Sequence, residues 1–249
     1  MCSPLKDVRK RLTPQIVAEF IGALVEQLRE RRLGALPIGE AFDEVYRKKI
    51  RPQGATLSGL GSESPFPDRY IDIVGKHTTA NKICIAVDGR YGDFSVGKRM
   101  RKCTSVYFWR CVSRRITAAN IQRYGDVENI HFRCADLQNC ALPNSNVGLI
   151  RQVFQHLTNT QIEQVLKNIE SQEDWRRTLI TEQVVYPPDE GAVNHDLPSH
   201  MVRIRVELGS RVFIDRPPFN RVAKRIALID DGWWGKAARN FVMVFELVR

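Results

Sequence analysis

The feature of this 249-residue sequence that most constrains its fold is an alternation of strand-like and helix-like segments that begins at Lys82. Strands are expected at residues 82–87, 105–110, 129–135, 147–151, 178–183, 225–229 and 241–247, and helices at residues 113–124 and 162–171. Strands that alternate with helices predict an α/β fold with a mostly parallel sheet, since parallel neighbours need a crossover between them. Ligands of such sheets bind beyond the carboxyl ends of the strands. The turns after Val87, Arg110 and Ala135 are therefore the expected ligand positions.

The residues before this region predict an N-terminal helical extension. Apolar residues recur at helical spacing from Pro14 to Arg32, and Gly34 is a typical helix stop. The apolar positions are Ile16, Val17, Phe20, Ile21, Leu24, Val25 and Leu28. A second helix is expected over Ile38–Lys49, followed by a loop rich in Gly, Ser and Pro. We therefore expect residues 1–67 to form a helical extension and loop, and residues 68–249 to form the α/β domain.

Several features of the composition exclude classes of protein. No apolar run reaches the roughly 18–20 residues needed to cross a bilayer, and the polar, basic residues 1–12 lack the apolar segment of a secretory signal. The six cysteines form no CxxC pair, and the five histidines show no zinc-ligand spacing. The sequence thus predicts a cytoplasmic protein with reduced thiols, no membrane partner and no metal.

The net charge of +10 is compatible with an acidic partner or a nucleic acid. Binding of single strands by stacking needs aromatic residues interleaved with basic ones. Only the segment from Tyr107 to Arg110 (YFWR) has that character. A nucleic-acid-binding module is therefore a weaker alternative that the sequence does not exclude.

Several short segments share the pattern of one enzyme family. They are residues 92–97 (GDFSVG), 134–136 (CAD), 149–157 (LIRQVFQHL) and 180–182 (ITE), with further similarity at residues 56–62 and 208–219. Together these segments resemble a bacterial group of class I S-adenosylmethionine-dependent methyltransferases over roughly residues 42–249, and RQVFQHL is the most specific part. The resemblance implies a class I methyltransferase (Rossmann-like) fold, S-adenosylmethionine as cofactor and a small-molecule methyl acceptor.

The resemblance also implies which residues would contact the cofactor. Asp88 matches the acid that ends the first strand, and Gly92 and Asp93 match the end of the glycine-rich turn. Asp136 stands where related enzymes hold the adenine amino group, although a cap of the following turn is an equally good interpretation. Arg151 belongs to the most specific segment and is the fifth expected contact.

The chain departs from the family pattern at four positions of this same pocket. Arg90 and Tyr91 replace a Gly-Cys pair and bring bulk into the turn. The second strand should be followed by a carboxylate that accepts hydrogen bonds from both ribose hydroxyls, but the matching residue is Cys111 or its neighbour Arg110. A thiol is a poor acceptor and a guanidinium only donates. Asn146 replaces an acid at the start of the fourth strand.

Gln155 and His156 follow the fourth strand, where the methyl acceptor of such enzymes approaches. An imidazole can act as a general base, which makes His156 the catalytic candidate of an active enzyme, with a purely structural histidine as the alternative. Glu182 and the pair Asp215-Arg216 are expected either to line the acceptor side or to form buried ion pairs.

Three functions are compatible with these residues. The first is a pseudoenzyme with impaired cofactor binding that acts as a non-catalytic partner or scaffold. The alternatives are an active methyltransferase with an atypical cofactor site and a nucleic-acid-binding module. A homodimer, or a heteromer with an active paralogue, is the expected assembly, with the N-terminal helices as the interface.

Overall fold

The computed structural model describes residues 13–48, 50, 66–77, 82–87, 105–110, 114–185, 192–200, 204–230 and 240–248. Several residues of the expected cofactor site lie outside these ranges, namely Asp88, Arg90, Tyr91, Gly92, Asp93 and Cys111. The strands on either side of them are described, so the structure still fixes where each of these segments leaves the sheet.

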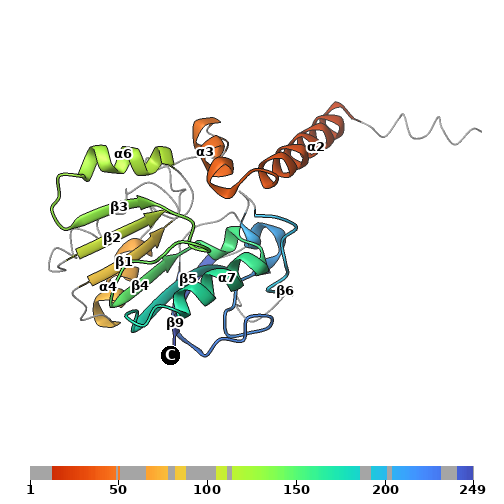
Figure 1. Cartoon of the computed structure of the whole chain (residues 1–249). Helices are drawn as coiled ribbons and strands as arrows, with labels where there is room; N and C mark the ends of the chain where they lie inside the picture. Colours follow the sequence, from red (N-terminus) through yellow and green to blue (C-terminus); the bar gives the residue numbers. More distant parts are fainter. Residues whose placement is uncertain are drawn as a thin grey trace, which may run out of the picture.

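A seven-stranded sheet is the centre of the described α/β domain (Figure 1). Its strands are β1 (Lys82–Val87), β2 (Ser105–Arg110), β3 (Ile130–Cys134), β4 (Val147–Arg151), β5 (Arg177–Val185), β8 (Ala223–Asp230) and β9 (Asn240–Leu247). They lie in the order β3-β2-β1-β4-β5-β9-β8. The five strands from β3 to β5 pair in parallel, whereas β9 is antiparallel to both of its neighbours.

The prediction of a mostly parallel sheet was wrong, because the sheet is mixed. The strands β8 and β9 follow one another in the chain and pair directly, and only residues 231–239 connect them. A parallel pair needs a crossover of a dozen or more residues, so this short connection requires antiparallel pairing.

The described helices are α2 (Pro14–Gly34), α3 (Ile38–Lys48), α4 (Phe66–His77), α6 (Arg114–Tyr124) and α7 (Asn159–Glu170). A capping box begins α7: the Thr158 hydroxyl accepts from the Gln161 backbone N–H, and the Gln161 side chain accepts from the Thr158 backbone N–H. The apolar face of α7, formed by Ile162, Val165 and Ile169, is buried in the main core. This helix therefore anchors one layer of the domain on the sheet.

The segment between β5 and β8 contains two short strands, β6 (Ala192–Val193) and β7 (Ser210–Arg211), and a 3-10 helix, η4 (Arg205–Leu208). Arg205 is completely buried here and donates hydrogen bonds to the carbonyl oxygens of Leu157 (2.5 Å) and His195 and to the Asn159 side chain (2.9 Å). These bonds connect the segment to the start of α7.

The helix α2 stands away from the α/β body (Figure 1). Its buried residues are Glu30 and Leu33, both near its C-terminal end, and Leu33 packs with Ala41 and Val45 of α3. An ion pair between Arg32 and Glu44 also connects the two helices. Within the described residues, no helix combines the length and the apolar character that spanning a bilayer requires.

Candidate functional site

The carboxyl ends of the five parallel strands lie at one edge of the sheet. The register places Val87 of β1 beside Arg151 of β4, and Arg110 of β2 beside Cys134 of β3. The chain leaves β1 for β2 on one side, while β4 lies on the other side, so the strand order reverses at β1. This reversal is the switch point at which α/β sheets bind ligands.

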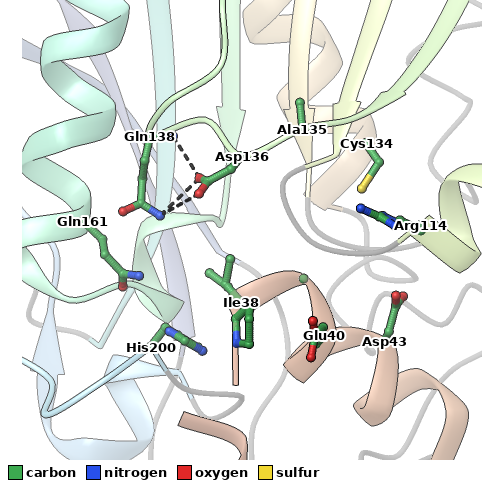
Figure 2. A pocket seen from close by; sticks show the side chains of 12 residues that line it. Ile38, Glu40, Asp43, Arg114, Cys134, Ala135, Asp136, Gln138, Gln161 and His200 are labelled. Carbon is green, nitrogen blue, oxygen red and sulfur yellow. Dashed lines mark hydrogen bonds between the residues drawn. The ribbon is translucent and has the colours of Figure 1, made fainter. Parts of the chain in front are cut away.

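A hollow of about 600 Å³ lies at the carboxyl end of β3 (Figure 2). It is lined by residues of α3, α6, α7, the turn after β3 and the segment before η4: Pro37, Ile38, Gly39, Glu40, Asp43, Arg114, Cys134, Ala135, Asp136, Gln138, Gln161 and His200. The side chains of Glu40 and Asp43 approach from α3, and Arg114 extends from the first turn of α6 toward Cys134 (Figure 2). Three carboxylates with one guanidinium make this hollow rich in hydrogen-bond acceptors.

Asp136 forms a turn that lines this hollow. Its Oδ1 atom accepts a hydrogen bond from the Gln138 backbone N–H at 3.0 Å and a second one from the Gln138 side chain at 3.1 Å. This arrangement is an Asx turn, the structural role expected of a turn cap. The residue also lines the hollow, so the carboxylate combines this structural role with access to a ligand.

Glu182 supports the 3-10 helix η3 (Phe154–His156), which follows β4. Its two carboxylate oxygens accept hydrogen bonds from the backbone N–H groups of Phe154 and Gln155, each at 2.9 Å. Burial raises the pKa of Glu182 to about 8, and these two hydrogen bonds oppose that rise. Glu182 thus holds the most specific sequence segment in place from the neighbouring strand.

Gln155 and His156 lie in this 3-10 helix, and neither lines the hollow. The His156 ring is buried and contacts Phe42 of α3 edge-on, with ring centroids 5.4 Å apart. The Oε1 atom of Gln155 is buried and has no hydrogen-bond partner among the residues that the structure describes. A buried amide oxygen without a donor is costly, and contact of Gln155 with a ligand stays a prediction.

Arg151 ends β4 at the switch point and is buried. Burial raises the pKa of the Tyr70 hydroxyl on α4, and the positive charge of Arg151 opposes this rise. The Arg151 guanidinium therefore lies close enough to Tyr70 to interact with it electrostatically. The next residue, Gln152, has a backbone φ of 51°, an uncommon value for a residue other than glycine. The backbone is therefore strained where β4 leaves the sheet, as is frequent at ligand sites.

The two residues of the pair Asp215-Arg216 contact different partners. The Asp215 carboxylate accepts a hydrogen bond from Arg225 of β8 at 2.8 Å. The guanidinium of Arg216 lies over the Phe213 ring, 5.1 Å from its centroid. These residues connect the segment before β8 to the sheet and lie outside the lining of the hollow.

Several residues of the hollow were not predicted from the sequence, including Glu40, Asp43, Arg114 and His200. Burial lowers the pKa of His200, which favours its neutral form. The helix over Ile38–Lys49 was expected to belong to the N-terminal extension, and two of its three acidic residues, Glu40 and Asp43, were the available signal. The fold brings them to Asp136 from almost a hundred residues away, which no local spacing predicts.

The arrangement is similar to that of several solved methyltransferases. An N-methyltransferase, NodS from Bradyrhizobium japonicum WM9 in complex with S-adenosyl-L-homocysteine, has a TM-score of 0.55 at 8% identity, covering 83% of this chain and 100% of that one. The 1,6-didemethyltoxoflavin-N1-methyltransferase of Burkholderia thailandensis has a TM-score of 0.54 at 13% identity, with 86% and 92% covered. Magnesium protoporphyrin IX methyltransferase from Synechocystis PCC 6803 has a TM-score of 0.52 at 9% identity, with 84% and 98% covered.

No protein-family model matches the sequence, and no curated protein sequence matches it significantly. At these low identities the structural similarity establishes the fold alone. The chain therefore has a class I methyltransferase fold, as its sequence motifs predicted, and the remaining functional assignments are proposals.

Proposed function

We propose that this protein is a methyltransferase-fold pseudoenzyme: its S-adenosylmethionine site is impaired, and it acts as a non-catalytic partner or scaffold. The observation that carries the proposal is the end of β2. This strand ends at Arg110, in register with Cys134, and Cys111 is the residue that follows it in the sequence. No Asp or Glu occurs anywhere in residues 105–115.

The chemistry of the ribose explains why this position matters. Two neighbouring hydroxyl groups are best bound by a carboxylate, which offers two acceptor oxygens. Hydrogen bonds to a charged acceptor are worth about 1.5–3 kcal/mol, so their loss weakens binding roughly 10- to 100-fold. The substitutions Arg90 and Tyr91 in the preceding turn act in the same direction, because they add bulk where the family pattern has small residues. The residues present therefore do not fit the complete cofactor.

A second candidate function is an active methyltransferase with an atypical cofactor site. The observation in its favour is the hollow of about 600 Å³ beside Asp136, together with the buried Oε1 atom of Gln155, which has no hydrogen-bond partner in the described part of the chain. A site that had lost every ligand would be expected to fill with side chains, since protein interiors are close-packed.

Calorimetric titration distinguishes the two candidates. The natural protein and an Arg90→Gly/Tyr91→Cys/Cys111→Asp variant are each titrated with S-adenosylmethionine and S-adenosylhomocysteine. We expect only the variant to bind. Micromolar binding by the natural protein would show that the site is intact and would favour the active enzyme. A Cys111→Ser variant is the matched control, because it changes the same position without supplying a carboxylate.

A further inference from the structure

We propose that a second copy of this chain covers the apolar face of α2, so that the protein is a homodimer held by an antiparallel pair of α2 helices. The face, called the α2 stripe here, consists of Ile16, Val17, Phe20, Ile21, Leu24, Val25 and Leu28. This inference goes beyond the proposed function and does not depend on it, because none of these residues lines the hollow at β3.

The α2 stripe exposes more apolar surface than a helix of a soluble monomeric protein usually does. Its seven side chains are between 40% and 70% exposed, and Phe20 is the most exposed of them. From the usual areas of such side chains we estimate about 500 Å² of apolar surface in each copy. Two copies would together bury about 1,000 Å², which reaches the lower limit expected of a biological interface.

The rest of the described chain does not cover this face. All residues from Pro14 to Val25 are exposed, and the helix contacts the body through its C-terminal end. The helix has 21 residues, but the exposed stretch from Pro14 to Val25 has only 12, and an isolated helix of about that length is marginally stable in water. Pairing would stabilise the exposed part of α2 by covering its apolar side.

The spacing within the α2 stripe fits a second α2 helix. Val17, Ile21, Leu24 and Leu28 are separated by four, three and four residues, the spacing of the seam in a two-helix coiled coil. In a symmetric antiparallel pair, Val17 lies opposite Leu28 of the other copy, and Ile21 lies opposite Leu24. Every seam position thus meets an apolar residue, and the pairing closes after two copies.

The charges near the end of α2 select the antiparallel orientation. Arg31 and Arg32 form the basic last turn, and Arg31 is exposed. A parallel pair would bring these arginines and the two α/β bodies together at one end. An antiparallel pair keeps the arginines and the α/β bodies of the two copies apart. It also places each positive helix end beside the negative end of the other helix.

The mass of the full chain in solution tests the pairing. Light scattering after size exclusion is expected to give about 57 kDa, twice the chain mass of 28.6 kDa. The variant Ile21→Glu/Leu24→Glu places charges in the seam and is expected to be a monomer by light scattering, with the folded structure checked by circular dichroism. The control Gln15→Glu/Gly22→Glu adds the same charge on the other side of α2, where Gly22 has open space around it, and should remain a dimer.

A charge exchange tests the orientation. Val17→Glu/Leu28→Lys places each glutamate opposite a lysine in an antiparallel pair and is expected to retain the dimer. Val17→Glu/Leu28→Glu is expected to dissociate it. A mass of 28.6 kDa at all micromolar concentrations would show a monomer and would overturn the proposal. Binding of such a monomer to vesicles of anionic phosphatidylglycerol would then show that the α2 stripe contacts a membrane surface instead. A dimer that survives Ile21→Glu/Leu24→Glu would also overturn the proposal, and loss of the dimer in the exchanged variant would overturn the antiparallel orientation.

Discussion

The carboxylate of Glu182 accepts a hydrogen bond from the backbone N–H of Phe154 at 2.9 Å, so that a fully buried acid on β5 holds the start of η3. Burial raises the pKa of this group to about 8 from an ordinary value of 4.5. The folded protein therefore keeps a proton on Glu182 at pH values at which the unfolded chain has released it.

This proton makes the free energy of unfolding depend on pH. Between about pH 5 and pH 8 the folded state binds one more proton than the unfolded state, so the free energy of unfolding is expected to fall as the pH rises. Glu182→Gln cannot titrate and should flatten this dependence. It also leaves one N–H of η3 without an acceptor, which is expected to cost about 1–3 kcal/mol at pH 5. Urea unfolding at a series of pH values measures both effects.

The control for this change is Glu173→Gln, at an exposed position. It should alter the free energy of unfolding by less than about 0.5 kcal/mol and leave its pH dependence unchanged. If Glu182→Gln keeps the slope of the natural protein, the buried carboxyl is not the group that titrates.

A second prediction concerns the contact between Gly148 and Trp175. The Trp175 ring is completely buried, its N–H donates to the Pro143 carbonyl at 2.9 Å, and a Cβ atom at position 148 would overlap the ring. Gly148→Ala is therefore expected to destabilise the protein by about 1–3 kcal/mol, measured by urea unfolding.

Gly75→Ala is the matched control, because Gly75 lies in α4 with open space around its Cα atom. There the helix propensity of alanine should raise stability by up to about 1 kcal/mol. Combining Gly148→Ala with Trp175→Leu should cost less than the sum of the two single changes, since the smaller side chain removes the overlap. Strict additivity would contradict the contact.

A third prediction concerns Arg205. Its guanidinium is completely buried and donates hydrogen bonds to the carbonyls of Leu157 and His195 and to the side chain of Asn159. Arg205→Met would remove the donor to each of these acceptors and is expected to cost about 3 kcal/mol or more. Arg205→Lys should cost less stability than Arg205→Met but more than the natural residue, because an ammonium group keeps a charge but cannot reach all the same acceptors.

The exposed Arg176 provides the control, since Arg176→Met should change stability by less than about 0.5 kcal/mol. Thermal unfolding followed by circular dichroism compares the three variants. Equal effects of Arg205→Met and Arg176→Met would mean that the bonds of Arg205 add nothing to the fold.

The sequence predicted those elements whose pattern is local and strong. The expected bounds of β1, β2 and β4 agree with the structure, because each is a short apolar run of the kind found inside parallel sheets. The helix α4 was missed, since residues 51–67 were expected to be a loop and Pro67 supported that interpretation. Pro67 is the second residue of α4, a position that does not need the missing N–H group.

One predicted site residue lies at the hollow. Asp136 was singled out through its motif and lines the hollow, while its contact with the cofactor stays a prediction. Glu40 and His200 were not singled out, since they reach the same hollow from α3 and from the segment before η4. The direction of β9 also depends on its pairing with β8 rather than on its own residues. Contacts between distant parts of the chain leave no periodic pattern in the sequence.

The last prediction separates the two roles of Asp136. Asp136→Ala removes the acceptor of the Gln138 N–H, whose bond is 3.0 Å long, and should cost about 1 kcal/mol of stability. In the Arg90→Gly/Tyr91→Cys/Cys111→Asp background it should also weaken S-adenosylhomocysteine binding about tenfold, as expected for loss of a charged acceptor. Gln138→Ala is the control, because it keeps the carboxylate and the backbone bond of the turn. Calorimetry and urea unfolding of the same samples give both quantities. A loss of stability without any change in binding would show that Asp136 only caps its turn, and the adenine would then have to be held elsewhere in the hollow.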